Sequence, residues 1–109
     1  MLDGLKAALD DTGLDFAFAA WSHSPDTDYG VYMLREQTAL SADEDAGAEV
    51  MLEGFIDYFT RDDSLSPKTT IENALRKLGI YWRLNSVQYE DDTGYIHYEW
   101  EWRNSNGAA

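Results

Sequence analysis

The stretch GYIHYEWEWRN at positions 94–104 alternates between two kinds of side chain, and no other feature of the sequence constrains the fold as strongly. One parity is apolar and aromatic: Ile96, Tyr98, Trp100 and Trp102. The other parity is polar: His97, Glu99, Glu101 and Arg103. A period of two is typical of a β-strand with one dry face and one wet face. We therefore predict a strand whose aromatic parity packs against a helix, with Glu99 and Glu101 facing water.

An acid–base site is the alternative interpretation of the same stretch. His97 and Glu99 share a parity and would lie about 7 Å apart on one strand face. Nothing near them resembles a nucleophile or a phosphate-binding loop, so a structural strand is the better interpretation. His23 lies beside Ser22 and Ser24 in the sequence. This does not indicate a catalytic triad, because the residues of a triad must be neighbours in space rather than in sequence. We predict no catalytic residues, and a small acid–base enzyme is the weakest of three functional hypotheses.

The rest of the chain divides into segments with their own periodicities and turn signals. In order, these are helix 2–11, strand 14–23, turn 24–30, strand 29–40, acidic loop 41–49, segment 50–62, helix 64–79, strand 80–90 and hairpin turn 91–94. Helix 64–79 is the clearest, with Ser66 as its N-cap, Pro67 at its first helical position and Gly79 at its end. Gly94 suits the hairpin turn, because glycine adopts positive φ readily.

Segment 50–62, VMLEGFIDYFTRD, fits either a helix or a strand. A helix would gather Met51, Phe55, Tyr58 and Phe59 on one face. A strand would separate Leu52, Ile56 and Tyr58 from Met51, Phe55 and Phe59. The β-rich FIDYFT and the central Gly54 favour a strand, with a bulge at Gly54.

The resulting order α-β-β-β-α-β-β predicts the α+β class: a mostly antiparallel sheet with two helices packed on one face. A length of 109 residues suits one domain spanning 1–109, and residues 104–109 are expected to form a flexible C-terminal tail.

Charge and composition limit the ligands that this chain can bind. Twenty-one acidic residues against eight basic ones give a formal charge of −13, which opposes direct nucleic-acid binding. The absence of cysteine suits a reducing cytoplasm, and two histidines are too few for a tight zinc site. The acidic clusters lack EF-hand spacing. We expect no metal, no cofactor and no membrane association.

Four aromatic residues suggest that a surface carries the function. Trp21, Tyr32, Phe55 and Phe59 cannot all face one core if the neighbouring parity is buried too. A small sheet with apolar residues on both faces needs a second cover, such as another subunit or a partner. We predict that these four residues form an interface.

The layout resembles that of the tail terminator, or tail completion, proteins of long-tailed bacteriophages. The resemblance spans roughly residues 14–103 and rests on the order of FAFAAW, PDTDYGVYM, an acidic loop, FIDYFTRDD, IENALRKLGI and QYEDDTGYIHYEWEW. It implies a structural virion protein without catalytic residues. Such a protein forms a ring, usually hexameric, that caps the tail tube at the neck, joins it to the head connector and assembles in the host cytoplasm.

The acidic loop is the expected tube-facing or inward-facing element of such a ring, through Asp43, Glu44, Asp45 and Glu49. DNA passing through would find no cations to bind on an acidic wall. The alternative function is a small acidic inhibitor that mimics DNA and blocks a host DNA-binding enzyme. Mimicry would require carboxylates spaced like phosphates on one continuous face, whereas the acidic residues here cluster in turns.

Overall fold

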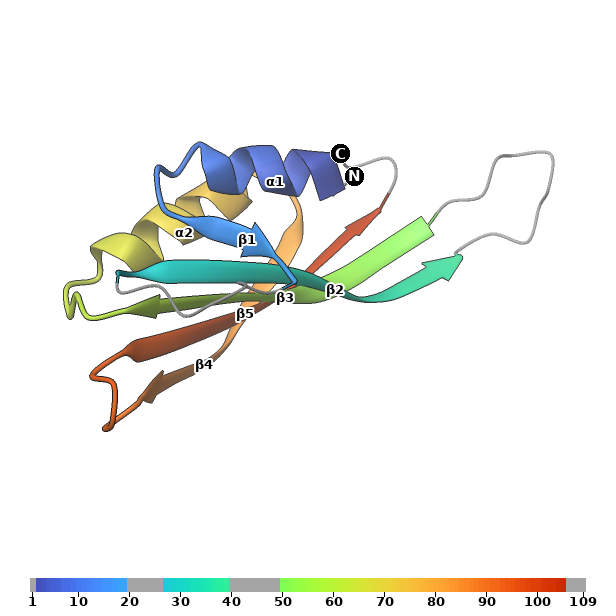
Figure 1. The fold of residues 1–109 in the computed structure, drawn as a ribbon. Coiled ribbons are helices and arrows are strands. Elements are labelled where there is room, and N and C mark those ends of the chain that lie inside the picture. The colour runs from blue at the N-terminus through green and yellow to red at the C-terminus, as the bar shows by residue number, and fades with distance from the viewer. Residues whose placement is uncertain (1, 20–26, 40–49, 106–109) are drawn as a thin grey trace, which may run out of the picture.

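The computed structural model describes residues 2–19, 27–39 and 50–105, together forming two helices and five strands (Figure 1). The elements are α1 (Leu2–Asp10), β1 (Phe16–Phe18), β2 (Tyr29–Ala39), β3 (Val50–Thr60), α2 (Ser66–Leu78), β4 (Tyr81–Tyr89) and β5 (Ile96–Ser105). The predicted α+β class and the predicted element order are both confirmed. None of the described helices has the length and apolar character needed to cross a membrane.

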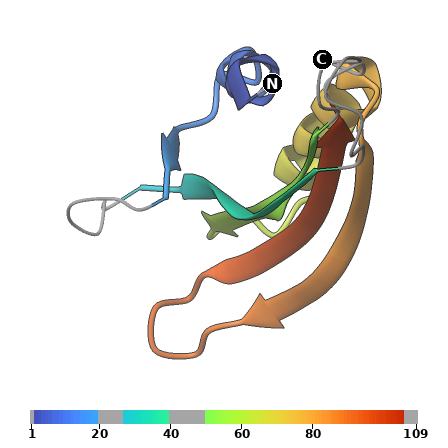
Figure 2. The same ribbon diagram turned by 90° about the vertical axis from the view of Figure 1, so that its right-hand side faces the viewer.

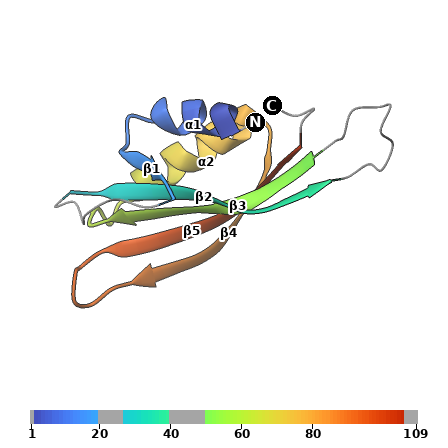
Figure 3. The same cartoon turned by 45° about the vertical axis from the view of Figure 1, so that its right-hand side comes forward.

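The strands form one sheet in the order β1-β2-β3-β5-β4, so β5 lies between β3 and β4 (Figures 1 and 2). Three of the four pairings are antiparallel, and β1 pairs with β2 in parallel. The expectation that these consecutive strands run antiparallel is wrong, because the connection 19–28 is longer than the tight turn that forces a hairpin. Both helices lie on the same side of the sheet, and no helix of the described residues covers the opposite face (Figure 3).

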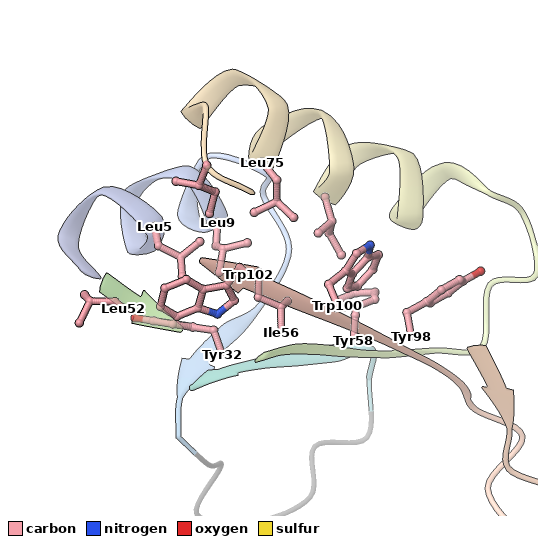
Figure 4. Packing of buried hydrophobic residues seen from close by; sticks show 12 residues of the cluster. Leu5, Leu9, Tyr32, Leu52, Ile56, Tyr58, Leu75, Tyr98, Trp100 and Trp102 are labelled. Atoms are coloured by element: carbon pink, nitrogen blue, oxygen red, sulfur yellow. The ribbon is translucent and has the colours of Figure 1, made fainter. Parts of the chain in front are cut away.

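The core lies between the two helices and the aromatic parity of β5. Trp100 and Trp102 are completely or almost completely buried, at 0% and 1% exposure. Leu5 and Leu9 of α1 and Leu75 of α2 project from the helices toward the sheet residues (Figure 4). Burying such side chains stabilises the fold by about 1.5–3 kcal/mol each. The prediction that the aromatic parity of 94–104 packs against helices is confirmed.

Segment 50–62 forms a strand over Val50–Thr60, as its β-rich composition predicts. Its buried positions alternate, with Leu52, Ile56 and Tyr58 facing the helices. The predicted bulge at Gly54 lies instead in the neighbouring strand, where the register shifts between Leu34 and Glu36. A Cβ atom on Gly54 would lie 1.8 Å from the carbonyl oxygen of Met33, so glycine accommodates the close approach of the bulged strand.

Helix α2 begins and ends with different kinds of cap. Ser66 is its first residue rather than its N-cap; the cap is Leu65, which makes no side-chain capping hydrogen bond. The prediction of a Ser66 N-cap is therefore wrong, because the helix begins one residue earlier than expected and Pro67 is its second residue rather than its first. Gly79 closes the helix with φ 82°, and its amide donates to the carbonyls of Leu75 and Arg76, as predicted.

The final hairpin follows the predicted layout. Gly94 adopts φ 77° in the turn, and its amide donates to the Glu90 carbonyl over 2.8 Å. Strand β5 continues to Ser105, into the segment 104–109 for which the sequence predicts a flexible tail. Asn104 is buried on that strand, and residues 106–109 lie outside the described residues.

Candidate interaction surface

The sheet face opposite the helices carries an ordered array of polar and aromatic side chains, which we call the open face. It comprises alternate residues of four strands: Tyr29, Val31, Met33 and Arg35 of β2, Glu53, Phe55, Asp57 and Phe59 of β3, His97, Glu99, Glu101 and Arg103 of β5, and Tyr81 and Arg83 of β4. Their strand partners and the helices' position on the other side place them together (Figure 3).

A chain of alternating charges crosses the open face from β2 to β4. Arg35 contacts Glu53 at 2.7 Å, and Glu53 contacts Arg103 at 3.3 Å. Arg103 reaches Glu101 at 3.5 Å, and Glu101 reaches Arg83 at 3.4 Å. The two glutamates are mostly buried, with side chains 19% and 10% exposed, whereas the arginines are about half exposed. The side chains of such a network restrain one another's positions more than the two side chains of an isolated surface pair do.

The position of Glu101 differs from what the alternation of polar and apolar residues in 94–104 predicts. The sequence predicts that it faces water, but the residue is 8% exposed. The guanidinium groups of Arg83 and Arg103 cover it from both sides, and a buried carboxylate is tolerated when such partners satisfy it. The open face is therefore more closely packed than an ordinary wet strand face.

Two arginines of the charge chain also lie over aromatic rings. The Arg35 guanidinium carbon is 5.2 Å from the ring centre of Phe55, and that of Arg103 is 5.2 Å from the ring centre of Tyr81. Contacts of this kind contribute about 0.5–1 kcal/mol at exposed sites. These contacts hold the two guanidinium groups over the sheet, and both aromatic rings remain partly accessible.

An aromatic stack occupies the other end of the open face. The ring of Phe59 stacks on Tyr29 at 4.7 Å and on His97 at 4.2 Å. The imidazole Nε2 of His97 lies 2.7 Å from Oδ1 of Asp57. This hydrogen bond with the Asp57 carboxylate raises the pKa of His97, while partial burial opposes the rise.

The structure does not assemble the acid–base pair considered from the sequence. His97 contacts Asp57 on the neighbouring strand, whereas Glu99 lies beside the Asn85 amide at 3.5 Å. No group of three or more histidine and carboxylate side chains in the described part of the chain is arranged to hold a metal ion. His23 lies outside that part.

The predicted interface residues separate into three groups. Phe55 and Phe59 lie together on the open face, partly exposed. Tyr32 does not join them: it pairs with Ile56 on the helix side and is 6% exposed, so the expectation that it is a surface aromatic is wrong. The remaining predicted residues lie outside the described residues: Trp21, Asp43, Glu44, Asp45 and Glu49.

Sequence reasoning missed the charge chain because its members come from four strands. Glu53 and Arg35 carry no motif, and their contact depends on the register between β2 and β3. One local signal was available: Glu101 and Arg103 share the polar parity of the last strand. A carboxylate and a guanidinium at i and i+2 on one strand face predict a lateral pair.

The charge pattern of the open face can be compared with the pattern that a DNA mimic requires. A DNA mimic would present carboxylates in continuous rows, but three arginines interrupt the glutamates here. The charge chain itself carries three cations and two anions. This face does not reproduce the charge pattern of a phosphate backbone.

Comparisons with known proteins find a likeness in structure but not in sequence. No protein-family model matches the chain. No curated protein matches its sequence significantly. Among solved structures, the fold is similar to a chain described as the sheath/tube terminator of an extracellular contractile injection system, PVC, in its extended state, determined by cryo-EM.

That likeness has a TM-score of 0.51 at 11% sequence identity and covers 96% of this chain. It covers 56% of the terminator, so the present chain spans about half the length of the protein it resembles. At this identity the likeness concerns the fold. Nearly the whole chain takes part in it.

Proposed function

We propose that this chain is a tail terminator subunit, a structural protein that caps the end of a phage-like tail tube. The observation that carries the proposal is the fold shared with a sheath/tube terminator over 96% of the chain. The resemblance of the sequence layout to phage tail terminators points in the same direction. The open face, which no described helix covers, offers a surface for contacts in such an assembly.

The proposed assembly is a homo-oligomeric ring, most simply a hexamer. Its subunits contact one another through sheet edges and meet the tail-tube protein on one side and the head connector on the other. Phe55 and Phe59 on the open face, together with Trp21, supply apolar contacts in this arrangement. Such a ring resides in the virion neck after assembly in the host cytoplasm, without membrane association.

The charge of −13 suits a ring through which DNA passes without being held. Neutralising phosphates requires Lys or Arg on the surface of the channel. The loop 41–49 is our candidate for the inward or tube-facing element, through Asp43, Glu44, Asp45 and Glu49.

Tube growth tests the proposed function directly. The purified chain is added to polymerising tail-tube protein from the same genome, and tube lengths and tube ends are recorded by electron microscopy. We expect shorter tubes of narrower length distribution, with ring-shaped density at one end. The variant with Phe55→Glu and Phe59→Glu serves as the control for surface dependence. Tubes that grow unchanged and show no density at either end would contradict the proposal.

A further inference from the structure

One end of the sheet gathers acidic residues from three separate segments; we call it the acidic end. The segments are 27–28 just before β2, 60–63 at and after the end of β3, and 90–94 between β4 and β5 (Figures 1 and 3). Arg61 joins all three. Its amide donates to Oδ1 of Asp28 at 3.1 Å, and its side-chain Nε donates to the carbonyl of Thr93 at 3.1 Å. The acidic end is therefore one surface held together by hydrogen bonds.

The acidic end carries six carboxylates and one cation, Arg61. The carboxylates belong to Asp28, Asp62, Asp63, Glu90, Asp91 and Asp92. Within the described part of the chain, none of the six forms an ion pair. The guanidinium carbon of Arg61 lies 4.1 Å from the ring centre of Tyr95, so this cation is directed to the ring and to the Thr93 carbonyl. The negative charge of the acidic end is therefore not compensated locally.

A hollow opens at this end beside the connection between α1 and β1. Its volume is about 510 Å³, and Asp15, Asp28, Tyr58 and Arg61 are among the residues that line it. Tyr58 is only 2% exposed, yet its hydroxyl makes no hydrogen bond with another described residue. The carboxylate of Asp15 also has no partner among the described residues. The hollow thus contains a buried hydroxyl and a carboxylate that are both free to bind a ligand.

The pKa of Tyr58 reflects the carboxylates around its hydroxyl. Burial raises this pKa to about 12, and the charges of Asp28, Asp15 and Asp62 contribute to the rise. The hydroxyl is therefore neutral at physiological pH, and its oxygen is available to accept a hydrogen bond. A buried hydroxyl without a partner is unfavourable, whereas an ammonium or guanidinium group would donate both to this oxygen and to the Asp15 carboxylate.

The acidic end also displays large apolar side chains, which indicates a protein partner rather than a free ion. Leu65 lies two residues after Asp63, and Tyr89 directly precedes Glu90. Both side chains are 66% exposed, the highest exposure among the large hydrophobic residues of the described chain. Exposed apolar groups rimmed by charged residues are typical of protein–protein contact sites.

A second copy of this chain cannot supply the complementary cations. Six of the eight basic residues contact carboxylates of their own molecule, namely Lys6, Arg35, Lys68, Arg76, Arg83 and Arg103. Arg61 belongs to the acidic end itself, and Lys77 lines the hollow between the two helices together with Asp11. Two copies also repel each other, at −13 each. The occupant of the acidic end is therefore a different molecule.

We propose that the acidic end is the docking site for a different protein, one that presents a lysine or arginine side chain beside apolar residues. The cationic head enters the hollow and donates to the Tyr58 hydroxyl and the Asp15 carboxylate, while the apolar neighbours cover Leu65 and Tyr89. This deepens the proposed function, because it gives the chemistry by which another component of the tail is recognised. The identity of that component rests on the proposed function.

A short peptide of alternating lysine and leucine serves as the probe of the site. Calorimetry at about 0.15 M salt measures its Kd for the wild type and for two variants. Tyr58→Phe removes the hydroxyl and retains the ring that packs on Phe16 at 5.6 Å, and Asp15→Asn removes one charge. We expect each variant to weaken binding about tenfold, because each removes a hydrogen bond to a charged group.

Asp3→Asn is the matched control, because it removes the same charge at the opposite end of α1 from the hollow. Its Kd should equal that of the wild type, and thermal melts establish that all variants fold. Equal binding by wild type, Tyr58→Phe and Asp15→Asn would show that the peptide responds only to net charge, and would overturn the hollow as the site. Absence of peptide binding by the wild type would overturn the proposal as well.

Titration with calcium chloride distinguishes a metal ion from a protein partner. We expect calcium to leave the Kd of the peptide unchanged beyond the screening that an equal ionic strength of sodium chloride produces. Calcium that binds the wild type, is lost in Asp15→Asn and displaces the peptide would assign the hollow to a metal ion and overturn the protein partner.

These outcomes are distinguishable from failure of the proposed function. Wild-type protein that shortens tail tubes, but binds the peptide no better than Tyr58→Phe does, overturns this docking site and leaves the terminator function standing. Wild-type protein that binds the peptide through the hollow, but leaves tube growth unchanged, overturns the terminator function and leaves the docking site standing.

Discussion

Gly54 shows at the scale of one residue how tightly β3 is packed between its neighbours. A Cβ atom there would lie 1.8 Å from the carbonyl oxygen of Met33 and 2.8 Å from Cζ2 of Trp102. Gly54→Ala should therefore destabilise the fold by at least about 1–3 kcal/mol, because the backbone at Met33 must move to make room for the added methyl group. Gly4→Ala is the control, since its Cβ meets only Leu78 Cδ1, at 3.6 Å. Thermal melts that rank the two variants in the opposite order would contradict this packing.

His97 is the residue whose charge should couple stability to pH. The Asp57 carboxylate raises the pKa of His97 in the folded state. The pair therefore stabilises the fold fully below the ordinary histidine pKa of about 6.5, and this contribution is lost as pH rises through the raised pKa. We expect the Tm difference between wild type and His97→Gln to be largest near about pH 6 and to shrink toward about pH 8.5. His23 is present in both proteins, so its contribution to the pH dependence cancels in the difference between their Tm values. A difference that does not change with pH would show that the pair is not ionised.

At the scale of elements, Glu72 attaches helix α2 to strand β5. Its carboxylate accepts a hydrogen bond from the indole Nε1 of Trp100 at 3.0 Å and pairs with Lys68 at 3.0 Å, although Glu72 is buried. The apolar stripe of α2 predicts which face it buries, but a glutamate within that face was not anticipated. The contact fixes the rotation of the helix above the sheet as well as its depth.

Glu72→Leu should destabilise the protein by about 1–3 kcal/mol, because the buried indole N–H loses its acceptor. Trp100→Phe in the same background should cost less than the sum of the two single changes, since neither polar partner then remains unpaired. Denaturant unfolding of the four proteins measures this coupling. Additive single effects would show that the hydrogen bond does not join the two elements.

At the scale of the whole molecule, net charge should govern assembly. Six subunits at −13 each carry 6 × −13 = −78. The screening length falls from about 30 Å at 0.01 M salt to about 8 Å at 0.15 M. Repulsion between whole subunits is screened over that range, whereas the apolar contacts of a subunit interface act at short distance and are not screened. Assembly should therefore strengthen as salt rises from about 0.01 M to about 0.15 M, and sedimentation measures this change.

The loop variant with Asp43, Glu44, Asp45 and Glu49 all changed to Lys tests the acidic wall in the same assembly. It should fold normally but retain DNA in the ring or fail to dock on its neighbour, because phosphates then meet cations. Particle assembly with the variant is the measurement, and circular dichroism is the control for folding. A strict monomer at every salt, together with normal infectious particles from the variant, would remove both the ring and the role of the loop.

Periodicity determined most of the elements in advance. The period of two in β3 and β5, the apolar stripe of α2 and the glycines at 79 and 94 follow from the geometry of a single strand, helix or turn. The fold class follows from the order of these elements. The partial exposure of Phe55 and Phe59 was also foreseen, because their parity in the strand opposes that of Ile56 and Tyr58.

Tertiary structure alone decided which neighbours these elements meet. Both parities of residues 29–34 are aromatic or apolar, so only the pairing of Tyr32 with Ile56 turned Tyr32 toward the helices. The insertion of β5 between β3 and β4 placed Glu101 between Arg83 and Arg103, and it left β4 at the sheet edge. The local sequence does not predict these placements, because each depends on contacts between segments far apart in the chain.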